Sequence, residues 1–441
     1  MNPLRALLVS YSFPPVGGAG VGRVTKLVKY LPDHQVAPSV LTAANPSVPV
    51  LDPNLLGNVP ADVEVVRVRT LEPDYRMKQA AWSAAASSSP LAVTPPTTSQ
   101  RLVHFASSLV RQALIPDPQV LWQPNAARAL ASRLAHKRDD AVLISGPPFS
   151  QFLLAALVRA RPGVAAVLDY RDEWSTYRST YEMMGTVAGA VGGPLETGLL
   201  RCAHAVTTAT EAFRENLLER FRFLDPGKVH AIPNGFDSDD FPASLPSPPP
   251  DRFVLTYAGT LFKLTSAQGL LGAIRRLHEH EPELAKLLRV RFLGRVVDTE
   301  ELYFTGMENL GVTREGYVAH EHVIPALAAS HMVLCLLDDV AGAERIYPAK
   351  IFELMYLGRP CLTLAPSGVL RDLVLRHRFG AVLPPRDEAA IAAHLAEQLR
   401  AFRDGRYAIT APADGIDVYH RRALAGDFAD VLRQAVADAR T

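Results

Sequence analysis

The chain has 441 residues, with 46 Lys and Arg against 45 Asp and Glu, and 48% of its residues are hydrophobic. This length predicts two or three domains, and the even charge balance gives no support to a nucleic-acid-binding protein. Cys202, Cys335 and Cys361 lie far apart and form no CxxC pair, so the sequence indicates neither a zinc site nor a disulfide framework. A reducing, cytoplasmic location is expected. No apolar run reaches the ~18 residues of a membrane span, which leaves peripheral contact with the inner face of a membrane open.

Short apolar runs alternate with helical patterns along the first 237 residues, as in a parallel α/β sheet. We expect strands over 4–10, 38–42, 63–68, 141–145, 164–169, 203–208 and 229–233, and helices over 21–30, 126–136, 151–161 and 209–220. Residues 83–98 are small, polar and proline-rich, and predict a mobile loop. The proline-rich residues 238–250 predict a linker between domains.

The same alternation resumes after the linker. Strands are expected over 253–257, 288–293, 332–337, 360–364 and 381–383, and helices over 266–279, 323–329, 349–357, 388–400 and 419–440. The sequence therefore predicts two βαβ domains, over 1–237 and 251–415, with a final segment, 416–441, whose helix packs back on the first domain. Ligands of such sheets bind at the carboxyl ends of the strands, so a cleft between two facing domains is the expected place for a site.

The glycine-rich loop over residues 12–20 follows the first strand, where backbone N–H groups can approach an anion. A dinucleotide motif is excluded because Arg23 stands where its third glycine is needed. A P-loop is excluded because Arg23 and Val24 replace its Lys-Ser/Thr pair. Gly17 and Gly18 remain candidates for contact with a phosphate, and a plain tight turn remains the alternative.

Lys350 and Glu353 lie three residues apart at the start of a predicted helix, so they share one face. An exposed ion pair is the simplest interpretation. However, lysine is scarce in this chain, with eight residues against 38 arginines, and a cation at a helix start suggests an anionic ligand. Lys263 follows Gly259 and Thr260 in the first strand-to-helix loop of the second domain, where an exposed loop lysine is the alternative.

These segments resemble the retaining glycosyltransferases of family 4 (group 1), and the resemblance covers nearly the whole chain. It rests on five elements in order: Ser10–Gly20, Asp169–Trp174, Ile232–Asp237, Tyr257–Thr260, and the Pro348-x-Lys350-x-x-Glu353 helix with Gly358-Arg359-Pro360. The resemblance implies the GT-B fold of two Rossmann-like domains.

The resemblance also implies roles for individual residues. Glu353 would bind the donor ribose, Lys350 and Lys263 the diphosphate, and the backbone near Val318 the base. Further donor contacts are expected at Gly17, Gly18, Gly259, Thr260, Glu344 and Arg345, acceptor contacts at Trp122 and Asp172, and catalytic roles for Asp172, Lys350 and Glu353. The chain departs from the family pattern at Arg345, where a glutamate is expected one residue after Glu344, and at Gln151 and Phe152, where many members carry a histidine.

The predicted function is hexosyl-type transfer from a nucleotide diphosphate sugar to an acceptor hydroxyl or amine, with retention and without a cofactor or metal. The Asp237-Ser238-Asp239 sequence is interpreted as a cap rather than a metal site, because it borders the linker. Two alternatives remain: a nucleotide-sugar 2-epimerase of the same fold, and a pseudo-glycosyltransferase or non-catalytic homologue. The sequence leaves open the base, the sugar, the oligomeric state and whether the acceptor is a glycan, a lipid-linked glycan or a small metabolite.

Overall fold

The computed structural model describes residues 2–18, 20–78, 114–175, 186–410 and 413–441. The loop expected over 83–98 lies outside these described residues. The chain divides into two compact units, the first formed by residues 1–232 and 424–441 and the second by residues 233–423. Among the described residues, no helix is both long and apolar enough to cross a membrane.

Unit 1 is built on a sheet of parallel strands, in the order β3-β2-β1-β4-β5-β6-β7 over the described residues. Their bounds are β1 (Leu4–Val9), β2 (Val36–Ala43), β3 (Val65–Val68), β4 (Ala141–Gly146), β5 (Ala165–Tyr170), β6 (Ala205–Thr208) and β7 (Val229–Ala231). Each of them overlaps a strand expected from the apolar runs.

Both faces of this sheet are covered, as a parallel sheet requires. Alternate residues of β1 point to opposite faces, so Leu7 and Val9 pack in one hydrophobic cluster and Ala6 and Leu8 in another. Over the described residues, the α-helices of the unit are α1 (Gly22–Tyr30), α4 (Gln123–Ala135), α5 (Leu154–Arg159), α6 (Thr186–Leu200), α7 (Glu211–Arg220) and α15 (Arg421–Arg440).

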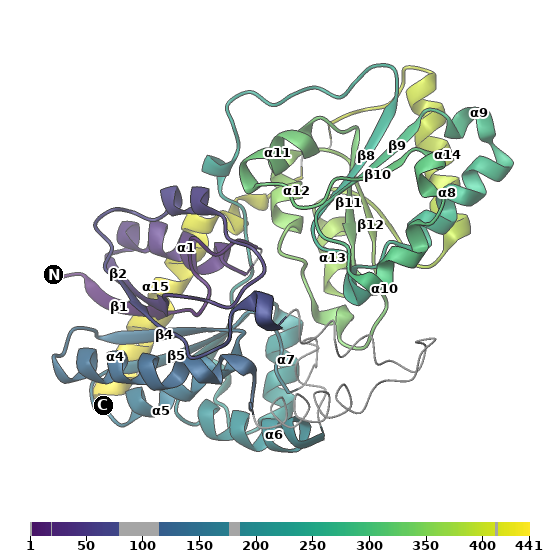
Figure 1. Cartoon of the computed structure of the whole chain (residues 1–441). Helices are drawn as coiled ribbons and strands as arrows, with labels where there is room; N and C mark the ends of the chain where they lie inside the picture. The colour runs from purple at the N-terminus through teal and green to yellow at the C-terminus, as the bar shows by residue number, and fades with distance from the viewer. Residues whose placement is uncertain (1, 19, 79–113, 176–185, 411–412) are drawn as a thin grey trace, which may run out of the picture. The chain divides into compact units, whose positions relative to one another are not determined.

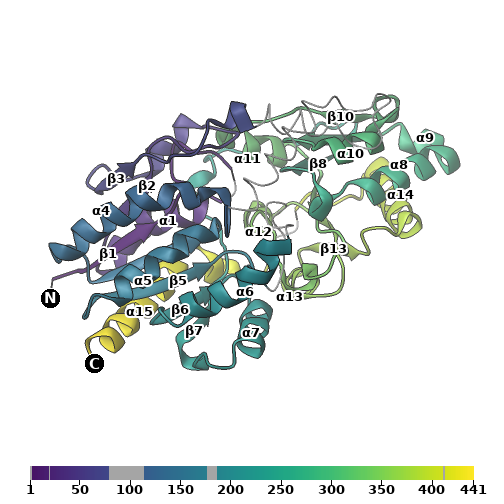
Figure 2. The ribbon, with the colours of Figure 1, turned by 60° about the horizontal axis from the view of Figure 1, so that its bottom comes forward.

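The last helix, α15, packs on the sheet of unit 1, which confirms the expected return of the chain (Figures 1 and 2). It joins the cluster that contains Ala6 and Leu8. Its apolar positions recur at helical spacing, and all are buried: Leu424, Phe428, Val431, Leu432 and Val436. Residues about 400 positions apart in the sequence therefore share one core.

Unit 2 carries the second parallel sheet, in the order β10-β9-β8-β11-β12-β13 (Figure 1). Its strands are β8 (Phe253–Ala258), β9 (Leu288–Leu293), β10 (Val312–Arg314), β11 (Met332–Leu336), β12 (Cys361–Leu364) and β13 (Gly380–Leu383). Its helices are α8 (Gln268–His280), α9 (Pro282–Ala285), α10 (Asp298–Glu301), α11 (His320–Ala328), α12 (Ile351–Leu357), α13 (Val369–Arg376) and α14 (Glu388–Arg403).

Five of these elements are absent from the sequence-based expectation: β10, α6, α13 and the four-residue helices α9 and α10. Strand β10 is three residues long and exposes Thr313 and Arg314, so it lacks the apolar run that marks a buried strand. Helix α6 is rich in glycine and contains Pro194, and helix α13 has only eight residues. Helix α12 also begins at Ile351 rather than at residue 349, with Lys350 in the capping position.

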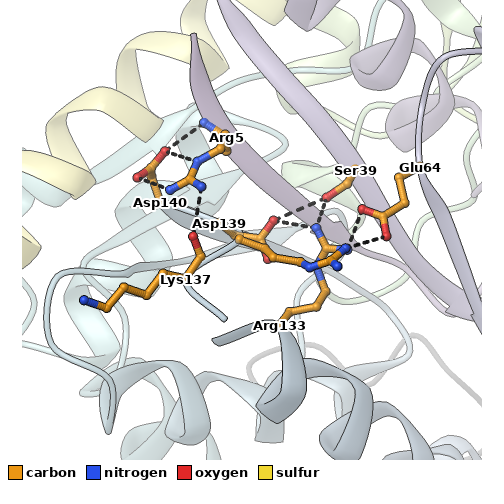
Figure 3. Close-up of polar contacts among 8 residues, drawn as sticks. Arg5, Ser39, Glu64, Arg133, Lys137, Asp139 and Asp140 are labelled. Atoms are coloured by element: carbon orange, nitrogen blue, oxygen red, sulfur yellow. Dashed lines mark hydrogen bonds and ion pairs between the residues drawn. The ribbon is translucent and has the colours of Figure 1, made fainter. Parts of the chain in front are cut away.

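A polar network at the amino-terminal edge of the first sheet ties α4 to the strands (Figure 3). Arg133 is buried, donates to Asp139 Oδ1 at 2.7 Å and Oδ2 at 2.8 Å, and also reaches Glu64 at 2.8 Å. Beside it, Arg5 donates to Asp140 at 3.0–3.1 Å. Each charge has an opposite charge within reach, and this edge lies away from the ligand-binding ends of the strands, so we assign the network to the structure of unit 1.

Candidate functional site

The loops after β8, β9 and β10 pack backbone against backbone at the carboxyl edge of the second sheet. Gly259 follows β8 and donates its N–H to the Leu293 carbonyl at 2.8 Å, and Gly294 donates to Gly316 at 2.6 Å. A Cβ atom on Gly294 would lie 2.3 Å from the Gly259 carbonyl oxygen, so only glycine permits this approach. The backbones of these loops are therefore in direct contact at this edge.

The side chain of Lys350 places a positive charge at this edge of the sheet. Its ammonium donates to the Ala258 carbonyl at 2.8 Å and lies 3.8 Å from the centroid of the Tyr257 ring. Both partners are neutral, and no carboxylate in the described part of the chain pairs with the half-buried Lys350. Such a charge is suited to binding an anion.

The other donor-site candidates described in this paragraph also belong to unit 2. Glu353 is half-buried in the first turn of α12, on the same helical face as Lys350. Lys263 is exposed and begins a short 3-10 turn, and the exposed Thr260 accepts through its carbonyl from the Tyr257 hydroxyl at 3.1 Å. Val318 is half-buried and lies two residues beyond Gly316.

Glu344 and Arg345 lie together in a 3-10 turn, Ala343–Arg345, ahead of α12. Arg345 pairs with Glu344, whose other carboxylate oxygen accepts from the Gly342 N–H at 2.9 Å. A Cβ atom on Gly368 would lie 2.4 Å from the Glu344 carbonyl, so the start of α13 packs directly on this turn. Glu344 thus holds its own loop in shape.

In unit 1, a buried ion pair joins α1, the helix after the glycine loop, to β5. Arg23 Nη2 and Asp169 Oδ1 are 2.9 Å apart, and their side chains are 2% and 0% exposed. Ser145 and Thr207 donate to the same carboxylate at 2.6 and 2.7 Å. Burial alone would raise the pKa of Asp169, but Arg23 and the two hydroxyls hold it below its usual value.

Within this loop, there is open space beside Gly18. Gly17 donates its N–H to the Val50 carbonyl at 3.1 Å, and nothing lies within 4 Å of a Cβ atom built on Gly18. Gly18 has a φ of +106°, which side chains rarely adopt. The two glycines thus lie in a different unit from Gly259 and Lys350.

The two acceptor candidates differ in exposure. Asp172 is exposed and lies two residues beyond the end of β5. Trp122 is fully buried, donates to the Val68 carbonyl at 3.3 Å, and meets the Tyr11 ring edge-on at 5.7 Å. A side chain without exposed surface has none to offer an acceptor, so we do not retain Trp122 as a contact residue; it supports Tyr11 instead.

Unit 1 contains a pocket of about 280 Å³ at the carboxyl ends of β1, β4 and β5. Its wall includes Tyr11, Ser12, Asp117, Pro147, Phe149 and Arg171. Asp117 is 5% exposed, and its Oδ2 accepts from the N–H groups of Phe149 at 2.6 Å and Ser150 at 2.9 Å. Burial raises the pKa of Asp117 to about 6.

Sequence reasoning missed Asp117. Its place between Pro116 and Pro118 predicts a stiff backbone just before a helix, but nothing in the sequence indicates its hydrogen-bond partners. Among the described residues, no group of three or more His, Cys, Asp and Glu could hold a metal ion.

Two Rossmann-like units with parallel sheets are the mark of the GT-B class of fold. Residues 17–235, nearly the whole of unit 1 before α15, match the family model described as "Glycosyl transferase 4-like domain". The first part of this chain is therefore similar to that domain. The comparison with curated proteins gave no match.

Solved structures share this fold along their whole length. Sucrose-phosphate synthase from Thermosynechococcus elongatus has a TM-score of 0.62 at 15% identity, covering 98% of this chain and 99% of that one. A glycosyltransferase from Rickettsia africae gives 0.57 at 13%, covering 99% of both chains. Anabaena HepE, solved in complex with UDP and glucose, gives 0.55 at 15%, covering 99% and 97%.

Proposed function

We propose that this protein transfers a hexosyl group from a nucleotide diphosphate sugar to an acceptor hydroxyl or amine, with retention and without a metal. The observation that carries the proposal is Lys350, a half-buried cation held by two neutral groups at the carboxyl edge of unit 2. The family match of residues 17–235 and the UDP bound in the similar HepE structure support the same reaction class.

In this proposal, the diphosphate of the donor lies against Lys350 and the backbone of the Gly259 loop. The leaving group is a diphosphate whose negative charge grows as the glycosidic bond breaks. A fixed ammonium that lacks a counter-ion stabilises that charge without reorganising. Lys263, exposed at the start of the next turn, is the second cation within the same loop.

We assign Glu353 to the ribose hydroxyls and the backbone at Val318 to the base. Because Arg345 replaces the glutamate of the family pattern and Glu344 already holds its own turn, we expect the sugar to be held mainly by other groups. Gly17 and Gly18 offer backbone to the acceptor or the diphosphate. Asp172, exposed beyond β5, is the candidate for orienting or deprotonating the acceptor.

Calorimetric titration with UDP, GDP and ADP tests the donor site. The protein is expected to bind one of these nucleotides, and Lys350→Gln is expected to weaken that affinity ~10- to 100-fold, as for the loss of a charge-assisted hydrogen bond. Lys286→Gln is the matched control, because Lys286 is an exposed lysine of unit 2 that pairs with Glu283. Equal affinity in the two variants would remove Lys350 from the site.

The same titration with Glu353→Gln tests the ribose assignment, with a smaller loss expected because the amide keeps one acceptor oxygen. Incubating the donor with and without acceptors then separates the reaction classes. Loss of donor only when an acceptor is present supports transfer. Epimerisation of the donor alone would contradict it.

A further inference from the structure

The amino-terminal edge of the first sheet carries a group of arginines where the chain enters β5, β6 and β7. These strands are neighbours in the sheet, and the segments 159–164, 201–204 and 220–228 lead into them. With Phe223, the basic residues of these segments form what we call the arginine surface: Arg159, Arg161, Arg201, Arg220, Arg222 and Lys228. It lies at the opposite edge of the sheet from the glycine loop and the pocket, so the site described above does not use it.

Side-chain contacts join the three segments into one surface. The Arg201 guanidinium lies 4.9 Å from the centre of the Phe223 ring, which meets the Phe221 ring edge-on at 6.1 Å. In the first segment, Arg159 Nη1 lies 2.9 Å from His204 Nε2, three residues beyond Arg201. Helices α6 and α7, which border these segments, lie next to each other (Figures 1 and 2). A ligand at one of the arginines would therefore meet the others.

The positive charge of this surface is mostly uncompensated. Among the described residues, Arg161, Arg201 and Arg222 are exposed and form no ion pair with a carboxylate. Lys228 pairs with Asp438 at 2.8 Å. The exposed acids in or beside the three segments are Glu219 and Asp225. Because the whole chain has a net charge of only +1, the arginine surface is a local concentration of positive charge.

Apolar side chains are exposed beside these arginines. Phe223 is 43% exposed, Val191 of α6 41% and Leu157 of α5 38%. Val191 lies two residues before Gly193, where a Cβ atom would lie 3.3 Å from Arg220 Nη2. Cations mixed with apolar side chains suit the boundary between lipid headgroups and acyl chains, where both kinds of group are satisfied together. A polyanion in solution would neutralise the arginines but leave Val191 and Leu157 in water.

We propose that the arginine surface binds an anionic lipid bilayer, with the arginines on lipid phosphate groups and Phe223 at the boundary with the acyl chains. A guanidinium suits this role because its planar set of N–H donors matches the oxygens of a phosphate. Each arginine near an anionic membrane strengthens binding about 5-fold. Binding to a lipid surface does not require the transfer reaction proposed above.

Co-sedimentation of the full chain with vesicles provides the test. Phosphatidylcholine vesicles containing about 30% phosphatidylglycerol are compared with vesicles of phosphatidylcholine alone. The protein is expected to bind the anionic vesicles, and binding should weaken at least ~10-fold between about 0.05 and 0.5 M NaCl because salt screens exposed charges. Equal binding to the neutral vesicles, or no binding to the anionic ones, would overturn the proposal.

The double variant Arg201→Gln/Arg222→Gln removes two unpaired cations of the surface. It is expected to weaken binding to the anionic vesicles ~10- to 30-fold. Arg69→Gln/Arg128→Gln is the matched control, because it removes two exposed arginines of unit 1 that lie after β3 and on α4, away from β5, β6 and β7. Equal binding by the two double variants would overturn the assignment of this surface.

Phe223→Ser tests the apolar contact without changing the charge. It is expected to weaken binding to the anionic vesicles ~3- to 10-fold, because the ring no longer leaves water. Undiminished binding would contradict the contact of Phe223 with the acyl chains. Because Phe223 and the two arginines are exposed, all of these variants should keep the melting temperature of the unmodified protein.

Two further probes separate a bilayer from other anionic partners. A short single-stranded DNA represents nucleic acids, and polyglutamate represents acidic proteins. Tighter binding of either probe than of the anionic vesicles would assign the surface to that class and overturn the proposal for lipid.

The nucleotide titration keeps this proposal separate from the proposed function. Vesicle binding that depends on Arg201 and Arg222, without nucleotide binding, would support the lipid surface and contradict the proposed transfer. Nucleotide binding without vesicle binding would contradict the lipid surface alone.

Discussion

The charged residues at the carboxyl edges of the two sheets differ in whether the protein supplies an opposite charge for them. In unit 1, Asp169 and Arg23 are both buried and lie 2.9 Å apart, so each charge is satisfied within the protein. In unit 2, the partners of Lys350 among the described residues are a carbonyl and an aromatic ring. The difference teaches that a charged residue at a strand end indicates a ligand only when the protein has not already neutralised it.

The two edges also differ in what removing a charge does. Taking one partner from a buried ion pair leaves the other charge uncompensated, which is far more costly than the pair's net contribution. Removing a cation that lacks a counter-ion leaves no opposite charge behind. Mutation should therefore reduce stability in unit 1 and binding in unit 2.

The largest effect is expected for Asp169→Asn. It leaves Arg23 buried without a carboxylate, so the free energy of unfolding of unit 1 should fall by about 3–5 kcal/mol. Chemical denaturation measures it. Glu283→Gln, which breaks an exposed pair with Lys286, should cost about 0–1 kcal/mol. Similar losses in both variants would show that the Arg23–Asp169 pair contributes no more to the stability of unit 1 than an exposed ion pair does.

Acid should weaken unit 2 through His331. This imidazole is 4% exposed and accepts from the Val254 N–H at 3.1 Å; burial, and then Arg359, lowers its pKa from 6.5 to about 4. The unfolded chain therefore binds the proton more tightly, so stability is full above pH 6.5 and is lost as the pH falls towards 4. The loss amounts to at most about 3 kcal/mol.

Calorimetric melting of the protein between pH 7 and 4 measures this effect. His331→Gln removes the titrating group, and the melting temperature of unit 2 should then depend less on pH over that interval. An unchanged pH dependence in the variant would assign the loss to other groups.

Gly259→Ala should disturb both folding and nucleotide binding. Gly259 has a φ of +145°, and a Cβ atom there would lie 2.3 Å from Lys350 Nζ. We expect a cost of about 1–3 kcal/mol from backbone strain, together with displacement of the ammonium. Gly405→Ala is the control, because Gly405 has a φ of +67° and open space around its Cβ position. Nucleotide affinity should fall in the first variant and not in the second.

The sequence predicts the sheets better than the sites. Apolar runs such as Leu4–Val9 mark buried parallel strands directly, and each expected strand is present, whereas β10 has no such run. Lys350 could be singled out because lysine is rare here and its position fits a family motif. Asp117 could not, because its importance comes from hydrogen bonds to Phe149 and Ser150, over 30 residues away.

Trp122 shows the converse case. The resemblance implies that it contacts the acceptor, whereas its burial depends on the packing of Tyr11 and β3, which no local pattern encodes. In the sequence, Arg23 is notable only because it breaks two nucleotide-binding motifs. Its partner, Asp169, lies 146 residues away, so the ion pair becomes visible only in the folded chain.

The smallest effect is expected at Asp237, which also tests the absence of a metal from the proposed reaction. Its side chain is 2% exposed and accepts from the Asp239 N–H at 3.1 Å, at the start of the 3-10 turn Ser238–Asp240. Asparagine caps as well as aspartate, so Asp237→Asn should change stability by only a few tenths of a kcal/mol, and Asp237→Ala by about 1 kcal/mol.

If Asp237 and Asp239 bound a metal, Asp237→Asn would be damaging although it keeps the cap. The variant would lose a carboxylate ligand, and metal binding would weaken. Transfer should therefore continue in EDTA, and Asp237→Asn should retain the activity of the unmodified protein with or without added Mn²⁺ or Mg²⁺. Activity that is lost in EDTA, restored by either ion and abolished by Asp237→Asn would show that a metal, rather than Lys350 alone, neutralises the diphosphate.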